Sequence, residues 1–390
     1  MVDKLIFDSK ILNTDRYSKN FSLPNFLYKE NGCFDKDKTV QLLANEEYGF
    51  VDESGVTVSV TQKVQDDWDE ISRGYRVAGK AYHRTFLFTI KKGDDSVIFP
   101  VEHFVPSKYV RNNPDIAEDG GVVPVKMKKG LPTILNINFL DESYTKHLPL
   151  EELIDNNLSI VHFNYNNVTK DNQDFSDGIA KFMTDRTKDN SAGKIALWAY
   201  ACNVVGEYLV DNSYADRDNI YIAGHSRLGK TALWACATTK VFTGCITNNS
   251  GAGGAAIYRE KKGESLEQVY NLFNGAWFCP GFKKYFNKEN SMPFDQHFLL
   301  ACVAPKLCLV NTAYQDTWAD SEAQYLACEA SSVVWENYNT KGLVKANTAD
   351  LRGERSLKGR LGFTNREGAH CFSRIDWLAI IDFLKEHKKL

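Results

Sequence analysis

The 390-residue sequence predicts an α/β fold, in which a mostly parallel central sheet lies between two layers of helices as a three-layer αβα sandwich. Three observations predict it: strand-like segments fill the region 56–163, helical patterns begin in earnest only after Phe175, and strands and helices then alternate to the C-terminus. The length allows two or three domains, but one sheet with insertions is the simpler expectation. We therefore expect residues 1–390 to form a single domain.

The elements can be predicted in chain order. The segment 1–50 is polar and rich in turn residues, so we expect it to wrap the surface. Strand-like runs follow at 56–61, 85–90, 97–101, 132–137 and 159–163. A long buried helix is predicted over 194–209, and the later strands at 218–223, 244–247, 306–311 and 361–364. An amphipathic helix over 375–384 closes the chain.

A turn of small and polar residues follows the predicted strand 218–223 and reads Gly-His-Ser-Arg-Leu-Gly-Lys from Gly224 to Lys230. A buried strand, a tight turn with a serine and then a helix form the context of a nucleophile elbow in the α/β-hydrolase fold. The second glycine is Gly229, one residue later than in the G-x-S-x-G pattern. The turn predicts that Ser226 is the nucleophile of a serine hydrolase, and a structural serine is the alternative.

Charge and composition argue against several classes of protein. A net charge of −3 and a pI near 6.3 provide no basic footprint for nucleic acid. No stretch approaches the ~20 apolar residues of a membrane span, and the first residues do not read as a secretory signal. Nine cysteines without C-x-x-C spacing are expected to be mostly buried free thiols. We expect a cytoplasmic protein, unless a signal was removed, with no metal or other cofactor.

A serine nucleophile needs a base, and in this fold the triad residues follow the chain order serine, acid, histidine. His370 follows the last predicted strand, and the small residues Gly368 and Ala369 allow the chain to turn towards the serine. His297 precedes the expected acid and stands at the head of a helical pattern, where packing or capping is the expected role. The sequence predicts His370 as the base.

Further segments of note follow the serine at Thr247–Ala256, Met292–His297 and Asp316–Asp320. Together with the serine turn they resemble the glucuronoyl esterases of carbohydrate esterase family 15 and their bacterial, acetylxylan-esterase-like relatives. The resemblance runs from about Asn20 to Trp377 and is densest from Gly193 to Glu322. It implies an α/β-hydrolase fold and the hydrolysis of esters, notably those that join 4-O-methyl-glucuronic acid on xylan to lignin alcohols.

The resemblance allows two positions for the acid of the triad. The first, after the strand that follows the elbow, is Asn249 here, which cannot carry a negative charge. The second lies after the next strand and is Asp316, which would hold the tautomer of His370 and stabilise its charged form. Asp320 is the alternative acid and otherwise a candidate helix N-cap.

The resemblance also implies the remaining site residues. Arg227 matches an arginine that helps to bind the oxyanion, with a surface salt bridge as the alternative. Lys230, Glu264 and Trp318 match positions that contact the sugar and the ester substituents, although each could instead be structural. We expect a glucuronoyl or other carbohydrate ester as substrate, cleaved through an acyl-enzyme. An acetylxylan esterase is the first alternative, and a carbohydrate-binding protein without turnover is the second.

Overall fold

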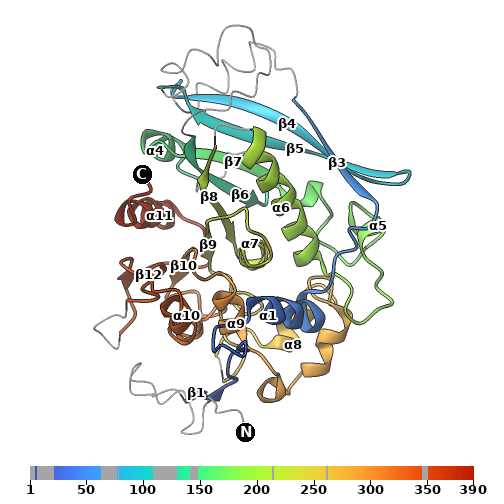
Figure 1. The fold of residues 1–390 in the computed structure, drawn as a ribbon, viewed down its shortest axis with the longest axis vertical. Helices are drawn as coiled ribbons and strands as arrows, with labels where there is room; N and C mark the ends of the chain where they lie inside the picture. The colour runs from blue at the N-terminus through green and yellow to red at the C-terminus, as the bar shows by residue number, and fades with distance from the viewer. Residues whose placement is uncertain are drawn as a thin grey trace.

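The computed structural model describes residues 5–6, 22–62, 77, 79–108, 130–140, 148–212, 215–260, 262–344 and 350–390. These ranges contain a ten-stranded sheet (Figure 1). Its strands lie in the order β11 (Arg355–Ser356), β12 (Leu361–Arg366), β10 (Leu307–Ala313), β9 (Gly244–Asn248), β8 (Ala215–His225), β6 (Leu131–Asn138), β7 (Ser159–Asn164), β5 (Asp95–Pro106), β4 (Ala81–Lys92) and β3 (Val56–Gln62). The strands from β12 to β7 pair in parallel, and β11, β5, β4 and β3 are antiparallel.

Helices cover both faces of this sheet. The helices α6 (Lys194–Asn212), α7 (Arg227–Thr238) and α10 (Ser321–Glu336) pack on one face, and α4 (Leu150–Asp155) and α11 (Arg374–Glu386) pack on the other (Figure 1). Successive side chains along a strand point to opposite faces of the sheet and so contribute to both cores. Ile220 and Ile222 of β8 pack towards α6 and α7, whereas Tyr221 and Ala223 belong to the core beneath α11. The predicted three-layer fold is therefore confirmed.

The smaller elements join and cover these layers. They are β1 (Leu5–Ile6), β2 (Ser22–Leu23), α1 (Lys36–Leu43), η2 (Ala44–Tyr48), η5 (Tyr165–Asn167), α5 (Ala180–Met183), α8 (Leu266–Asn271), η6 (Pro280–Tyr285), η7 (Glu289–Ser291) and α9 (Gln296–Ala301). The expectation that helices begin only after Phe175 was wrong, because α1 and α4 precede it. Helices of six to eight residues span about two turns, which is too short for a clear apolar period.

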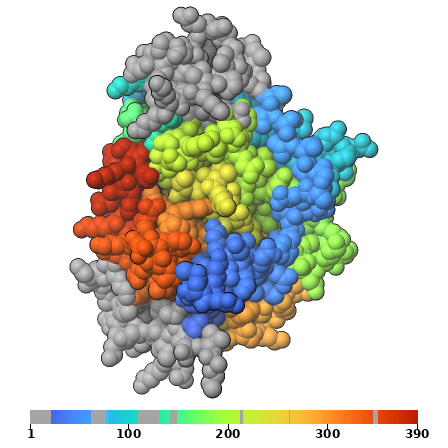
Figure 2. Space-filling model, in the orientation of Figure 1, coloured from blue at the N-terminus to red at the C-terminus, as the bar shows by residue number. Residues whose placement is uncertain are grey.

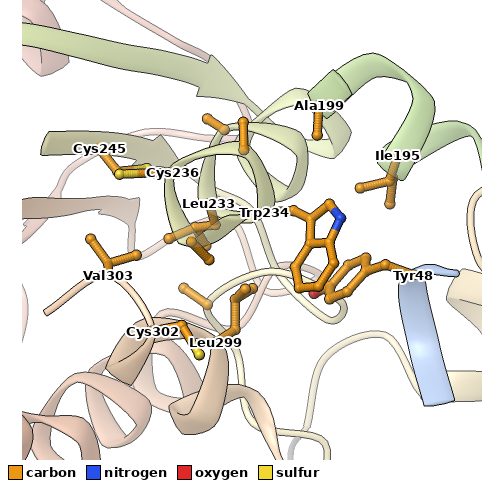
Figure 3. Packing of buried hydrophobic residues seen from close by; sticks show 14 of the residues in the cluster. Tyr48, Ile195, Ala199, Leu233, Trp234, Cys236, Cys245, Leu299, Cys302 and Val303 are labelled. Carbon is orange, nitrogen blue, oxygen red and sulfur yellow. The ribbon is translucent and has the colours of Figure 1, made fainter. Parts of the chain in front are cut away.

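The N-terminal segment contributes to the core as well as to the surface. Leu23, Phe26 and Phe34 are buried, and α1 contacts α9. In Figure 2 this segment, in dark blue, lies beside the orange C-terminal part of the chain. Deeper inside, the ring of Tyr48 stacks on Trp234 of α7, with centroids 4.4 Å apart (Figure 3). The segment thus helps to hold the helix that follows the elbow.

The strands predicted from the sequence are all present, and several are longer than their apolar runs. The run 85–90, for example, lies within β4, which spans Ala81–Lys92. All nine cysteines are free, and seven of them are buried. None of the helices in the described ranges combines the length and apolar character that a membrane span requires. These ranges also hold no group of His, Cys, Asp and Glu side chains arranged to bind a metal ion.

Candidate active site

The serine turn is strained in the way a nucleophile elbow requires. β8 ends at His225, α7 begins at Arg227, and Ser226 between them has φ 56° and ψ −125°. A positive φ is costly for a residue with a side chain, so surrounding contacts must hold it. A Cβ atom on Gly224 would lie 2.1 Å from the carbonyl oxygen of Leu228, so only glycine fits there. The turn therefore presents Ser226 at the carboxyl end of β8.

The displaced second glycine has a packing reason. A Cβ atom on Gly229 would lie 2.9 Å from Oγ1 of Thr247 and 3.1 Å from Cβ of Ser250. The hydroxyl of Thr247 also donates to the carbonyl of Gly229 at 3.1 Å. Gly229 thus lets the first turn of α7 lie close against the end of β9.

The predicted base and acid meet at the same edge of the sheet. Nδ1 of His370 lies 2.6 Å from Oδ2 of Asp316, whose side chain is buried, while the histidine is partly exposed. Oδ1 of Asp316 accepts from the amide of Ala319 at 3.2 Å. Asp320 instead caps α10 by accepting from the amide of Ala323, and it also accepts from two amides of the 262–263 loop. Of the two candidate acids, the geometry pairs Asp316 with the histidine.

An ion pair anchors the loop that carries His370. Nε of Arg366, the last residue of β12, donates to both carboxylate oxygens of Asp376 in α11 at 2.8 Å. Its NH2 group also donates to the carbonyl oxygens of Ala369 and Cys371, on either side of the histidine. Gly368 has φ 109°, so the turn predicted there uses a conformation that favours glycine. The loop is thereby held over the end of the sheet.

Arg227 lies in an aromatic cage and is held by a carboxylate that the sequence analysis missed. Its NH1 group forms an ion pair with Oδ2 of Asp171. Cζ of Arg227 lies 4.8–5.6 Å from the ring centroids of Phe139, Phe273 and Trp277, within range of cation–π attraction. Its Nε–H has no hydrogen-bond partner among the described residues. That Nε–H is buried, but the side chain as a whole is 25% exposed, so a ligand can still reach the arginine.

The carboxylate of Asp171 accepts hydrogen bonds from three side chains. Besides Arg227, it accepts from the indole Nε1 of Trp277 and from the hydroxyl of Tyr165, each at 2.8 Å. Its side chain is only 6% exposed. The one signal that could have found it is its place in a polar loop soon after the strand 159–163, because the carboxyl ends of parallel strands form the ligand-binding edge.

Lys230 and Glu264 lie together but inside the protein. The ammonium of Lys230 donates to the carbonyl oxygens of Ser250 and Ala252 at 2.5 Å and lies 3.4 Å from Oε1 of Glu264. That oxygen also accepts from the amide of Ala252 at 2.9 Å, and both side chains are at most 5% exposed. Burial lowers the pKa of Lys230, and the carboxylate opposes this effect. These contacts favour the structural alternative for both residues.

Trp318 is placed differently from that pair. Its side chain is among the large exposed apolar groups, at 47%, and it stands two residues after Asp316. Its backbone carbonyl accepts from the amide of Glu264 at 3.0 Å, which ties the two loops together. The indole is therefore free to contact a ligand near the acid.

The remaining histidine candidate packs against another part of the chain. His297 is buried at the start of α9, and its Nε2 lies 2.9 Å from the carbonyl of Pro24. Its ring packs against Phe26 and Phe298. The expected packing role is confirmed.

The chain is similar to esterases among the known proteins. The family model described as glucuronyl esterase of fungi matches residues 121–339. The carbohydrate esterase MZ0003 from an unknown prokaryotic organism is 36% identical over 195 residues, which cover 50% of this chain and 44% of that protein. The 4-O-methyl-glucuronoyl methylesterase of Hypocrea jecorina is 28% identical over 187 residues, 46% of this chain and 40% of that protein. The chain thus spans less than half the length of these two relatives.

A solved structure extends the likeness to nearly the whole chain. The glucuronoyl esterase from Solibacter usitatus superposes with a TM-score of 0.75 at 24% identity and covers 94% of this chain and 98% of its own. This match shows the fold. Because the family model matches more than half of the residues, the chain belongs to the glucuronyl esterase family.

Proposed function

We propose that this chain hydrolyses glucuronoyl esters of the 4-O-methyl-glucuronoyl type, through an acyl-enzyme formed on Ser226. One observation carries the proposal. Nδ1 of His370 lies 2.6 Å from Oδ2 of Asp316, on the edge of the sheet where the strained serine follows β8. Family membership supports the ester chemistry, and the methylesterase activity in the name of the Hypocrea jecorina relative supports the acyl group.

Asp316 would prepare His370 for acylation. The carboxylate accepts the Nδ1–H of the ring, so Nε2 is left unprotonated and can take the proton of Ser226. The serine oxygen then attacks the ester carbonyl, and Asp316 stabilises the imidazolium that forms. His370 returns the proton to the leaving alcohol, and a water molecule activated by the same ring releases the glucuronate from the serine.

Two kinds of donor would bind the oxyanion. The amides of Arg227 and Leu228, the first two of α7, have no partner within the helix, whereas those of Gly229 and Lys230 donate to the carbonyl of Ser226. The partly exposed guanidinium of Arg227 adds a charged donor, and Asp171 keeps it in place. Loss of a single neutral donor of this kind costs about 2.7–4 kcal/mol in other serine hydrolases. We therefore assign Arg227 to the stabilisation of the transition state.

Trp318 is the residue that best suits a sugar. Its exposed indole offers an apolar face for a pyranose ring close to the acid. Lys230 and Glu264 stay candidates for substrate binding, although their hydrogen bonds to each other and to the backbone leave them little to offer a ligand. That observation favours keeping acetylxylan as the second candidate substrate, because the pair no longer argues for a hydroxyl-rich acyl group.

The test is a comparison of two esters. The chain should cleave benzyl glucuronate with a higher kcat/KM than 4-nitrophenyl acetate, despite the better leaving group of the acetate. Trp318→Ala should lower kcat/KM for the glucuronate and leave the acetate rate nearly unchanged. Faster cleavage of acetate, or of acetylated xylan, by the wild type would replace the glucuronoyl assignment with the acetyl esterase.

A further inference from the structure

A second histidine lies against the base. The ring of His225, the last residue of β8, packs on the ring of His370 with centroids 4.5 Å apart and planes inclined by 45°. Phe372 stacks on His225 at 6.3 Å, and Phe139 approaches its ring edge-on at 6.2 Å. Rings from separate parts of the chain thus surround the residue before the nucleophile, and one of them is the base.

A chain of hydrogen bonds fixes the orientation of the neighbouring amides. The backbone N–H of Ala313 can only donate, and it donates to Oδ1 of Asn249 at 3.0 Å. Nδ2 of Asn249 then donates to Oδ1 of Asn248 and to the carbonyl of Cys371, each at 3.3 Å. The atom of Asn248 that faces this amide is therefore its oxygen.

This chain also determines the tautomer of His225. Its Nδ1 lies 2.6 Å from Oδ1 of Asn248, which can only accept, so Nδ1 carries the hydrogen. Burial, together with the smaller effect of the neighbouring His370, lowers the pKa of His225 to about 3, against weaker opposing effects of the hydrogen bond to Asn248 and of Asp316. The aromatic neighbours Phe139 and Phe372 are uncharged. His225 therefore stays neutral while His370 gains and loses its proton.

The base needs such a neighbour because it is poorly enclosed. The side chain of His370 is 39% exposed, and its hydrogen bond to Asp316 holds only one ring nitrogen. A second ring whose centroid lies 4.5 Å from that of the imidazole restricts the orientation of the imidazole as well. A neutral neighbour also adds no repulsion when His370 becomes an imidazolium.

We propose that His225 is a positioning residue, which holds the imidazole of His370 in line between Ser226 and Asp316. The inference rests on the proposed function, since it concerns the base of that reaction. Misplacement of a catalytic group by about 1 Å can cost on the order of 10² in rate. Removal of the ring face should therefore lower kcat and leave KM close to its original value.

Three variants test this role in the full chain, with benzyl glucuronate as substrate. His225→Ala should lower kcat on the order of 10². His225→Phe restores a flat ring without the Nδ1–H and should recover most of that loss. His297→Ala removes a buried histidine that packs on Phe26 and Phe298, and it should lower the melting temperature without changing kcat. Equal losses of kcat in His225→Ala and His225→Phe would overturn the positioning role. A change in KM with an unchanged kcat would overturn it as well.

A spectroscopic measurement checks the tautomer of His225 on which this role depends. In ¹⁵N NMR spectra of the imidazoles, His225 should keep the neutral Nδ1–H tautomer between pH 8 and 5. Titration of His225 within that range would contradict the inference. Ser226→Ala distinguishes a failure of the proposed function from a failure of the positioning role. If that variant keeps its activity, the proposed function fails. If it is inactive but His225→Ala is fully active, only the positioning role fails.

Discussion

Nδ1 of His370 and Oδ2 of Asp316 lie 2.6 Å apart, although 54 positions of the chain separate the two residues. The sheet explains this contact. β10 and β12 are parallel neighbours whose last residues, Ala313 and Arg366, are in register. The loops that follow must therefore leave the sheet side by side, one with the acid and one with the histidine.

The acid can be identified by removing its charge. Asp316→Asn should lower kcat by about 10⁴, as loss of the triad aspartate does in other serine hydrolases, because the ring loses its tautomer and its counter-charge. Asp320→Asn is the matched control: it should weaken the cap of α10 and cost at most about 1 kcal/mol of stability. Steady-state kinetics and thermal melts of both variants decide the matter. A larger loss of kcat in Asp320→Asn would move the acid there.

Asp171 should contribute to kcat by holding the guanidinium of Arg227 in place. In Asp171→Asn the guanidinium loses its ion pair, so it can leave the position from which it would bind the oxyanion. We expect kcat to fall by up to about 10². Asp174→Asn is the control, because this carboxylate in the same loop accepts from the amide of Ser176 instead. If both variants kept wild-type kcat, Arg227 would not depend on Asp171.

The two acid positions of the family predict, on sequence alone, that Asn249→Glu restores part of the rate to Asp316→Asn. The contacts of Asn249 lead to the opposite expectation. Its Nδ2 donates to the carbonyl of Cys371, next to the base, and a carboxylate has no donor for that oxygen. The double variant should be no faster than Asp316→Asn and should melt at a lower temperature. Recovery of the rate would show that the site adapts to either acid position.

Glu47 should make stability depend on pH. It is fully buried against Tyr258 and Gln296, and burial raises its pKa to about 8. The folded protein then holds a proton that the unfolded chain releases above about pH 4.5, so Glu47 destabilises the fold increasingly as the pH rises towards 8. Urea unfolding at pH 5, 7 and 9 should show that Glu47→Gln gains stability over the wild type with rising pH.

Glu46 is the matched control for this measurement. It is the neighbouring residue, but its hydrogen bonds to Lys284 and Tyr285 lower its pKa. Its contribution is lost as the pH falls, so Glu46→Gln should show no gain at high pH. A constant stability difference between wild type and Glu47→Gln across the range would mean that Glu47 is ionised in the folded protein.

The central layers were predictable because their signals are local. The apolar runs of β6, β8 and β10 and the serine turn can be recognised in short windows. Chain order then placed His370 and Asp316 after consecutive strands of the edge that binds ligands. The compartment stays a prediction.

The contacts that surround the triad could not be predicted in this way. Asp171 meets Trp277 across 106 positions, and nothing near it in sequence indicates that partner. Lys230 suits a sugar site by residue type, but its burial depends on the loop 250–252 folding over it. The buried Leu23 and Phe26 are likewise isolated apolar residues in a turn-rich segment, where composition suggests only surface.

Hydrolysis of benzyl glucuronate by the wild type and by Ser226→Ala tests the central claim most directly. Ser226 is the last residue before α7 and its side chain accepts no capping hydrogen bond from that helix, so its hydroxyl contributes little to the fold. The variant should melt within a few degrees of the wild type and lose kcat by about 10⁶, as does removal of the nucleophile in other serine hydrolases. A folded Ser226→Ala protein that still turns over the ester at a substantial rate would contradict the account.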